Sequence, residues 1–186
     1  MIGVRPARPA DALAIGAVHV AAWRSAYAGI LPNAYLARLS VTRQAAMYER
    51  TILRGAVVRI AVDEAAEPGR PRVVGFATAA RRAHSLGDGE IETLYVLDDW
   101  RERGVGRQLL MTAAQGLAEA GCTSAFVWVL RDNPSRWFYQ RMGGREAGTG
   151  TVTVAGGAIP QVAYVWNPIE TVLEPAPGRN GHDAAG

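Results

Sequence analysis

Two glycines and three arginines stand close together in the middle of the chain. Gly104 and Gly106 carry no side chain, so a ligand can approach the backbone closely at both positions. Apolar residues follow them at helical spacing, so the glycines would open a helix whose first amide groups and dipole favour an anion. Arg101, Arg103 and Arg107 add positive charge to the same turn. The pattern predicts a pyrophosphate site; the alternative is a glycine-terminated loop with a solvated, arginine-rich face.

The glycine spacing differs from two common phosphate-binding motifs. A P-loop needs Gly-Lys-Ser or Gly-Lys-Thr, and neither follows these glycines. The dinucleotide fingerprint Gly-x-Gly-x-x-Gly needs a third glycine, and Leu109 occupies that position. The predicted anion site is therefore of another kind.

The elements that must position this turn follow from hydrophobic periodicity and from the Gly and Pro breaks. Their predicted order is β-α-α-β-β-β-α-β-α-β-β. The predicted strands cover residues 2–5, 57–62, 73–79, 90–96, 124–130, 149–154 and 161–166. The four helices in this order cover residues 11–27, 42–54, 104–120 and 134–142, a further short helix is expected over 33–39, and a polar loop is expected over 81–89. Hairpins outnumber β-α-β crossovers, which favours a mixed α/β sheet over a doubly wound one.

The length and composition indicate one globular domain. The chain has 186 residues, of which 49% are hydrophobic. We expect a single domain over 1–167 and a disordered Pro-, Gly- and Ala-rich tail over 168–186. The sequence contains neither an apolar stretch of membrane-spanning length nor a signal-peptide pattern, so we expect no membrane contact and a cytoplasmic location. Cys122, the single cysteine, is expected to be a buried thiol.

The charge distribution argues against a nucleic-acid-binding domain. All 20 basic residues are arginines, the net charge is only +3, and the arginines are scattered rather than gathered into a run. A compact anion fits the local cluster better than a polyanion does.

Two ordered blocks of this sequence resemble the GNAT acetyltransferase family. The stretch from Leu94-Tyr-Val to Leu110 contains Arg101-x-x-Gly104-x-Gly106, which is similar to the acetyl-coenzyme A signature of that family. Asn133 and the run Trp137-Phe-Tyr-Gln-Arg-Met-Gly-Gly resemble its second block. The resemblance spans about residues 2–166. It implies a central mixed, mostly antiparallel sheet of about seven strands, splayed in the middle and flanked by four or five helices.

The resemblance also implies the co-substrate acetyl-coenzyme A (acetyl-CoA) and no metal. Its diphosphate would lie on backbone amides of the glycine-bearing turn, and its pantetheine arm would pair with the strand before that turn. The residues implied in binding it are Leu94, Tyr95, Val96, Arg101, Glu102, Arg103, Gly104, Val105, Gly106, Arg107, Asn133 and Arg136.

Candidate catalytic residues follow from the need for a neutral amine and a protonated leaving thiol. Glu90 and Glu92 alternate along the predicted strand, so either can act as base; Glu90 is preferred, and a bulge would change which one points inward. Solvated carboxylates at the strand end are the alternative. Tyr139 matches the position where the family places an acid, with core packing as the alternative.

The acceptor is expected to be a primary amine of a small molecule or a protein. His19, Trp23 and Tyr27 lie at helical spacing and would border its pocket, with ordinary helix packing as the alternative. A homodimer through an edge strand is compatible with the sequence. Two other functions stay open: an acyltransferase that uses another acyl-CoA donor, and a CoA-binding regulatory module without turnover.

Overall fold

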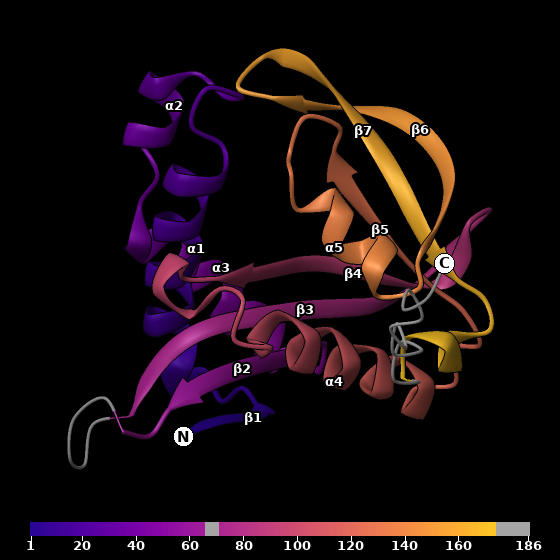
Figure 1. Cartoon of the computed structure of the whole chain (residues 1–186). Coiled ribbons are helices and arrows are strands. Elements are labelled where there is room, and N and C mark those ends of the chain that lie inside the picture. The colour runs from indigo at the N-terminus through magenta and orange to yellow at the C-terminus, as the bar shows by residue number, and fades with distance from the viewer. Residues whose placement is uncertain (66–70, 174–186) are drawn as a thin grey trace, which may run out of the picture.

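A seven-stranded sheet forms the centre of the molecule in the computed structural model, which describes residues 1–65 and 71–173 (Figure 1). The strands are β1 (Ile2–Pro6), β2 (Val57–Asp63), β3 (Arg72–His84), β4 (Gly87–Val96), β5 (Ala125–Leu130), β6 (Arg145–Val154) and β7 (Gly157–Trp166). The α-helices are α1 (Ala12–Ala26), α2 (Asn33–Ala37), α3 (Val41–Leu53), α4 (Val105–Glu119) and α5 (Arg136–Arg141). The strand order is β1-β2-β3-β4-β5-β7-β6, which confirms the predicted fold class.

The sheet divides between β4 and β5. These two strands run parallel and pair over three positions, from Gly89 with Ala125 to Ile91 with Val127, whereas the other neighbouring strands are antiparallel. Both strands continue beyond that pairing, to Val96 and Leu130, and Figure 1 shows them diverging. The splayed sheet that the resemblance implied is therefore present.

A carboxylate holds the two strands together at the paired end. Asp88 accepts hydrogen bonds from the backbone N–H groups of Thr123 and Ser124, each at 2.9 Å, and from the Ser124 hydroxyl at 2.7 Å. These bonds hold the pKa of the Asp88 carboxyl well below its usual range. The divergence of β4 and β5 therefore starts from a fixed point.

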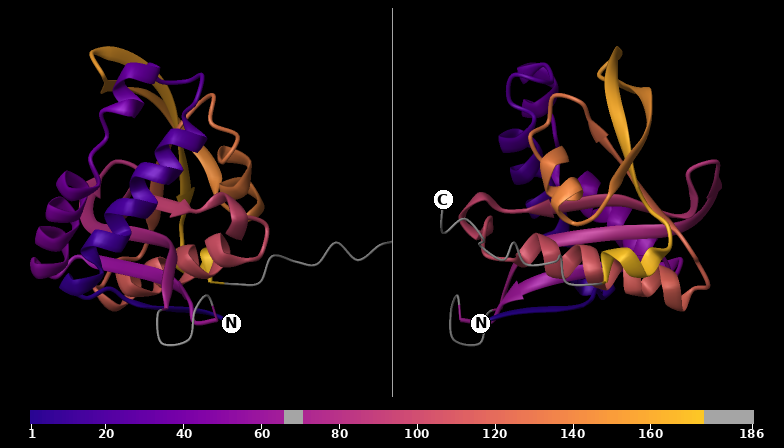
Figure 2. Two further views of the ribbon diagram at one scale, coloured as in Figure 1. Left: turned by 90° about the vertical axis from the view of Figure 1, so that its left-hand side faces the viewer. Right: turned by 45° about the vertical axis from the view of Figure 1, so that its right-hand side comes forward.

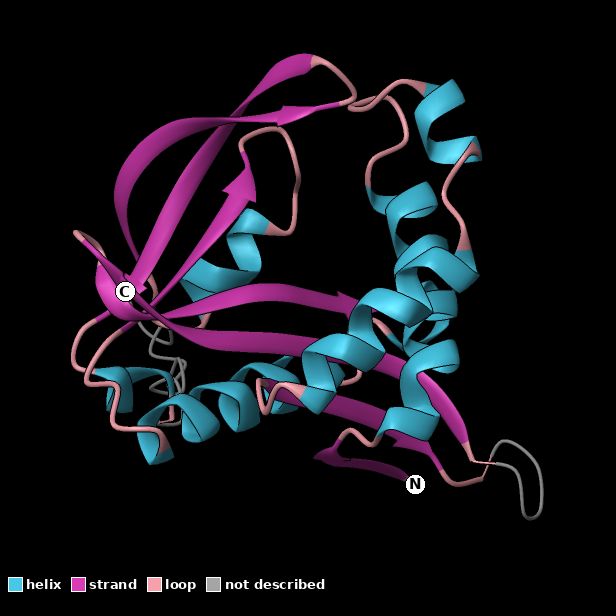
Figure 3. Cartoon of the chain, turned by 180° about the vertical axis from the view of Figure 1, so that it is seen from behind, coloured by secondary structure: helices cyan, strands magenta, loops and turns pink. Residues whose placement is uncertain are grey.

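Helices cover both faces of the sheet. Helix α4 places Leu109, Leu110 and Leu117, all fully buried, against β2, β3 and β4. Helices α1 and α3 pack together on the opposite face, as Figures 2 and 3 show. The first half of the sheet is thus enclosed as a three-layer core.

A separate apolar cluster joins the two diverging halves. Tyr27 and Leu31, which follow α1, and Leu36 of α2 are buried, and Val154 and Ile159, from the β6–β7 hairpin, pack against them. Figure 3 shows the segment around α2 beside the tip of this hairpin. The helical side and the hairpin side therefore meet above the gap in the sheet.

Two expectations about the chain's organisation need correction. The loop expected over 81–89 is a hairpin, because β3 continues to His84 and β4 begins at Gly87. Polar residues can extend this hairpin since its end is exposed and Arg82 pairs with β4 carboxylates.

The core also extends past residue 167, where the tail was expected to begin. Ile169 and Val172 belong to a 3-10 turn and are fully buried, because their apolar side chains pack into the core beside α4. Residues 174–186 of the expected tail lie outside the described residues. No helix in the described ranges is long and apolar enough to span a membrane.

Candidate active site

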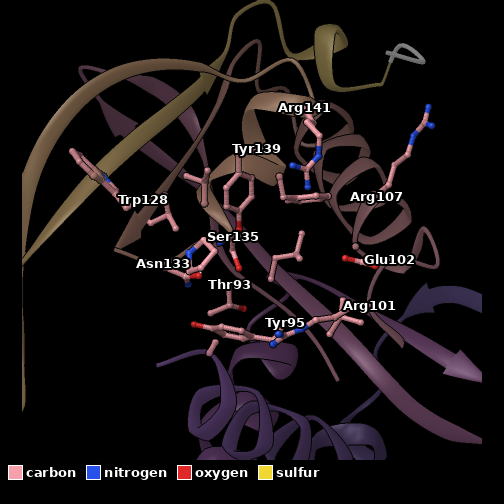
Figure 4. A pocket seen from close by; sticks show the side chains of 18 of the residues that line it. Thr93, Tyr95, Arg101, Glu102, Arg107, Trp128, Asn133, Ser135, Tyr139 and Arg141 are labelled. Atoms are coloured by element: carbon pink, nitrogen blue, oxygen red, sulfur yellow. The ribbon is translucent and has the colours of Figure 1, made fainter. Parts of the chain in front are cut away.

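A cavity of about 470 Å³ lies where β4 and β5 diverge (Figure 4). Five parts of the chain line it: the end of α1, strand β4, the turn that opens α4, strand β5 and the segment through α5. The residues predicted to bind cofactor or substrate, or to act in catalysis, that line this cavity are Tyr27, Glu92, Leu94, Tyr95, Val96, Arg101, Glu102, Gly104, Gly106, Arg107, Asn133 and Tyr139.

One end of the cavity has the properties of an anion site. Gly104 caps helix α4 with φ at +79°, a conformation that glycine adopts without strain. Gly106 lines the cavity, and a Cβ added there would make ordinary van der Waals contact with the Phe138 ring at 3.6 Å, so a side chain would take up part of the space beside the first helical turn. Arg101 and Arg107 line the same end. Free amides, positive charge and space for a ligand therefore coincide.

Helix α5 adds a cation that the sequence analysis missed. Arg141 lines the cavity, and Figure 4 shows it above the α4 end. Ser135, Phe138 and Arg141 all line the cavity and follow one another at intervals of three residues. That spacing places residues on one helix face, so it was the pattern that could have revealed Arg141.

The middle of the cavity is built from buried polar groups. Tyr139 is buried, and loss of water raises the pKa of its phenol above the ordinary value. Asn133 is also buried, and its Oδ1 accepts a hydrogen bond from the Ser135 N–H at 2.9 Å. The Tyr27 and Tyr95 hydroxyls lie 3.3 Å apart on the opposite wall. Because its pKa is raised, the Tyr139 phenol stays protonated at neutral and moderately alkaline pH.

The two strand carboxylates occupy different positions. Glu92 lines the cavity, whereas Glu90 is not among the lining residues. The β3–β4 register shifts around Glu92: Thr78 pairs with Thr93, while Ala79 pairs with Ile91. This bulge inserts Glu92 as an extra residue at the point where the cavity begins. The position of Glu90 therefore does not support the expectation that it is the base.

Arg82 links both carboxylates. Its guanidinium forms an ion pair with Glu90 and lies 3.3 Å from Glu92. Burial, the largest influence, raises the pKa of Glu90, while the nearby Arg82 charge opposes that rise. Both carboxylates consequently lie on the same face of the sheet as Arg82.

Three residues expected at the cofactor site do not line the cavity. Arg103 is exposed, Val105, the first residue of α4, is buried in the core, and the Arg136 guanidinium lies 4.3 Å from the centre of the Trp137 ring. The contribution of their backbone amides stays a prediction.

The expected acceptor wall on α1 is only partly exposed to the cavity. Tyr27 lines it, while His19 and Trp23 stack on each other behind it, with ring centroids 5.0 Å apart. His19 Nδ1 is hydrogen-bonded to the Tyr48 hydroxyl at 2.7 Å, and burial lowers the pKa of His19 to about 4. A neutral, packed histidine supports the wall from behind rather than forming its surface.

Comparison with known proteins identifies a family. Residues 22–144 match the model of the acetyltransferase (GNAT) family. An uncharacterized N-acetyltransferase of Bacillus subtilis (strain 168), YuaI, is 34% identical over 168 residues, which cover 89% of this chain and 93% of that protein.

Solved structures share the fold at lower identity. The ribosomal-protein-alanine N-acetyltransferase of Brucella melitensis has a TM-score of 0.68 and 22% identity, over 89% of this chain and 99% of that chain. YncA, a putative acetyltransferase of Salmonella typhimurium solved with acetyl-CoA, has a TM-score of 0.66 and 17% identity, over 100% of this chain and 98% of that chain. In the described part of our chain, no group of three or more His, Cys, Asp or Glu side chains could hold a metal ion.

Proposed function

The chain belongs to the acetyltransferase (GNAT) family and is an acyltransferase, and we propose that it transfers the acetyl group of acetyl-CoA to a primary amine. The observation that carries this proposal is the composition of one cavity. Its α4 end suits a diphosphate, and Tyr139 and Glu92 line the same space. YncA, a structural neighbour of this chain, was solved with acetyl-CoA, which supports the choice of donor.

The α4 end would hold the cofactor. The backbone amides that follow Gly104 donate to the diphosphate, and Arg101, Arg107 and Arg141 balance its charge. The exposed edge of β4 from Leu94 to Val96 lies where β5 no longer pairs, so its backbone groups are available to the pantetheine arm.

Glu92 and Tyr139 would carry the proton transfers. Glu92 removes a proton from the acceptor ammonium, directly or through water, and the neutral nitrogen attacks the thioester carbonyl. The carbon–nitrogen bond forms and the carbon–sulfur bond breaks, and the Tyr139 phenol donates its hydrogen to the departing sulfur. The second proton of the attacking nitrogen passes through water to the phenolate left on Tyr139, which restores the phenol. The products are an amide and free CoA. The raised pKa of Tyr139 keeps this donor protonated across the working pH range.

The test separates cofactor binding from turnover. Calorimetry with CoA should give a dissociation constant in the micromolar range, and acetyl-CoA with a panel of primary amines should release free thiol. Binding without thiol release from any amine would favour the regulatory module and overturn the proposal. Faster thiol release from propionyl-CoA or succinyl-CoA than from acetyl-CoA would show instead that the donor is that other acyl-CoA.

A further inference from the structure

An indole ring faces the cavity at the end opposite α4. Trp128 lines the cavity from β5, and Figure 4 shows it apart from the labelled arginines, on the far side of Asn133 and Tyr139. Trp128 was not among the expected site residues, because a tryptophan within an apolar strand gives no sign of which face it occupies.

The strand register places Trp128 beside Glu92. The last residues paired between β4 and β5 are Ile91 and Val127, so Glu92 and Trp128 are the first residues of each strand beyond the pairing. Glu90 pairs with Phe126 just before them. Because side chains alternate along a strand, Phe126 and Trp128 share a face, and Arg82 bonding to both carboxylates puts Glu92 on that face too.

Strand β6, which lies beyond β7 in the sheet, leaves room for this ring. A Cβ added at Gly150 of β6 would lie 3.4 Å from two atoms of the indole, and one added at Gly148 would lie 4.0 Å from it. The indole thus packs against a backbone without side chains. Its position is fixed from behind, and it is half-buried rather than enclosed.

The charges beside the ring favour one kind of acceptor. Glu92 attracts a cationic amino group, and an aromatic face adds to that attraction. Among the described residues beside Glu92 on this face, the guanidinium of Arg82 already pairs with two carboxylates. An acceptor that carried its own carboxylate next to the amino group would have to displace one of them.

Building on the proposed function, we infer that Trp128 selects the acceptor. The acceptor is a primary amine with an apolar body and no carboxylate on the carbon that bears the amino group. Its body lies on the indole ring, and its amino group points toward Glu92.

The test compares phenethylamine with phenylalanine, which differ by that carboxylate, and with ethylamine, which lacks the apolar body. Thiol release from acetyl-CoA should give kcat/KM at least about tenfold higher for phenethylamine than for phenylalanine. Trp128→Ala should raise KM for phenethylamine about tenfold while KM for ethylamine and the CoA dissociation constant stay unchanged. Trp128→Phe should remain within about threefold of the original protein.

A matched control uses the exposed tryptophan of α5. Trp137→Ala removes an indole that does not line the cavity, so its kinetics should equal those of the original chain. If the protein prefers phenylalanine, or if Trp128→Ala leaves the KM for phenethylamine unchanged, this inference is overturned. Thiol release in the same assay would still support the proposed function. No thiol release with any amine overturns both.

Discussion

The two ends of the cavity are built by different means. At the α4 end, backbone amides and two glycines within three residues form the surface, and arginines surround it. At the other end, side chains from three different segments, Tyr27, Glu92 and Trp128, form the surface. The first end depends on one local turn, whereas the second depends on how the sheet diverges. A change at either end should therefore affect one substrate and spare the other.

Tyr139 lies between the two ends, and its replacement should have the largest effect. Tyr139→Phe removes the proton donor and keeps the ring that packs in the core, so kcat should fall about 1,000-fold. The CoA dissociation constant should stay within about twofold, measured by calorimetry. Unchanged kcat would remove Tyr139 from its proposed role.

Glu92 and Glu90 form a matched pair, since both bond to Arg82 but only Glu92 lines the cavity. Glu92→Gln should lower kcat/KM about 100-fold near neutral pH, and Glu90→Gln should lower it less than about threefold. The Glu92→Gln deficit should shrink as the pH rises toward the pKa of the acceptor amine, because a neutral amine needs no base. Equal effects of the two substitutions over the pH profile would contradict this assignment.

Gly106→Ala should separate cofactor binding from stability. The added Cβ projects into the lining of the cavity, in contact with the Phe138 ring, and should raise the CoA dissociation constant about tenfold. The free energy of unfolding should not fall, because alanine is favoured over glycine within a helix by about 0.5–1 kcal/mol. Calorimetry and urea unfolding measure the two quantities. A loss of stability without a loss of binding would show that this glycine serves the fold.

Arg141 and Arg103 give the smallest expected contrast. Arg141→Ala should weaken CoA binding about fivefold at low salt, because it removes a cation that lines the cavity. Arg103→Ala removes an exposed arginine outside the cavity and should change binding less than about twofold. The difference should diminish as the salt concentration rises. A larger effect of Arg103→Ala than of Arg141→Ala would show that the cation that binds CoA lies in the loop before α4 and not on α5.

The difference between the two ends of the cavity also explains which parts of the site could be predicted from the sequence. Gly104, Gly106 and Arg107 lie in one turn, so a local pattern revealed that end of the cavity, and hydrophobic periodicity revealed the elements around it. Trp128 reaches the cavity only through strand pairing, which no local pattern encodes. The bulge that favours Glu92 over Glu90 likewise appears only in the pairing of β4 with β3. Long-range pairing, rather than residue type, determines which side chains meet at the acceptor end.

The apolar cluster above the gap has a consequence for motion. Leu31 and Leu36 on the helical side share contacts with Val154 and Ile159 on the hairpin side. Widening the gap would expose these side chains to water, which costs free energy in proportion to the area uncovered. We therefore expect the two sides to be coupled mechanically, so that the hairpin tip and the segment around α2 open together as one cooperative unit.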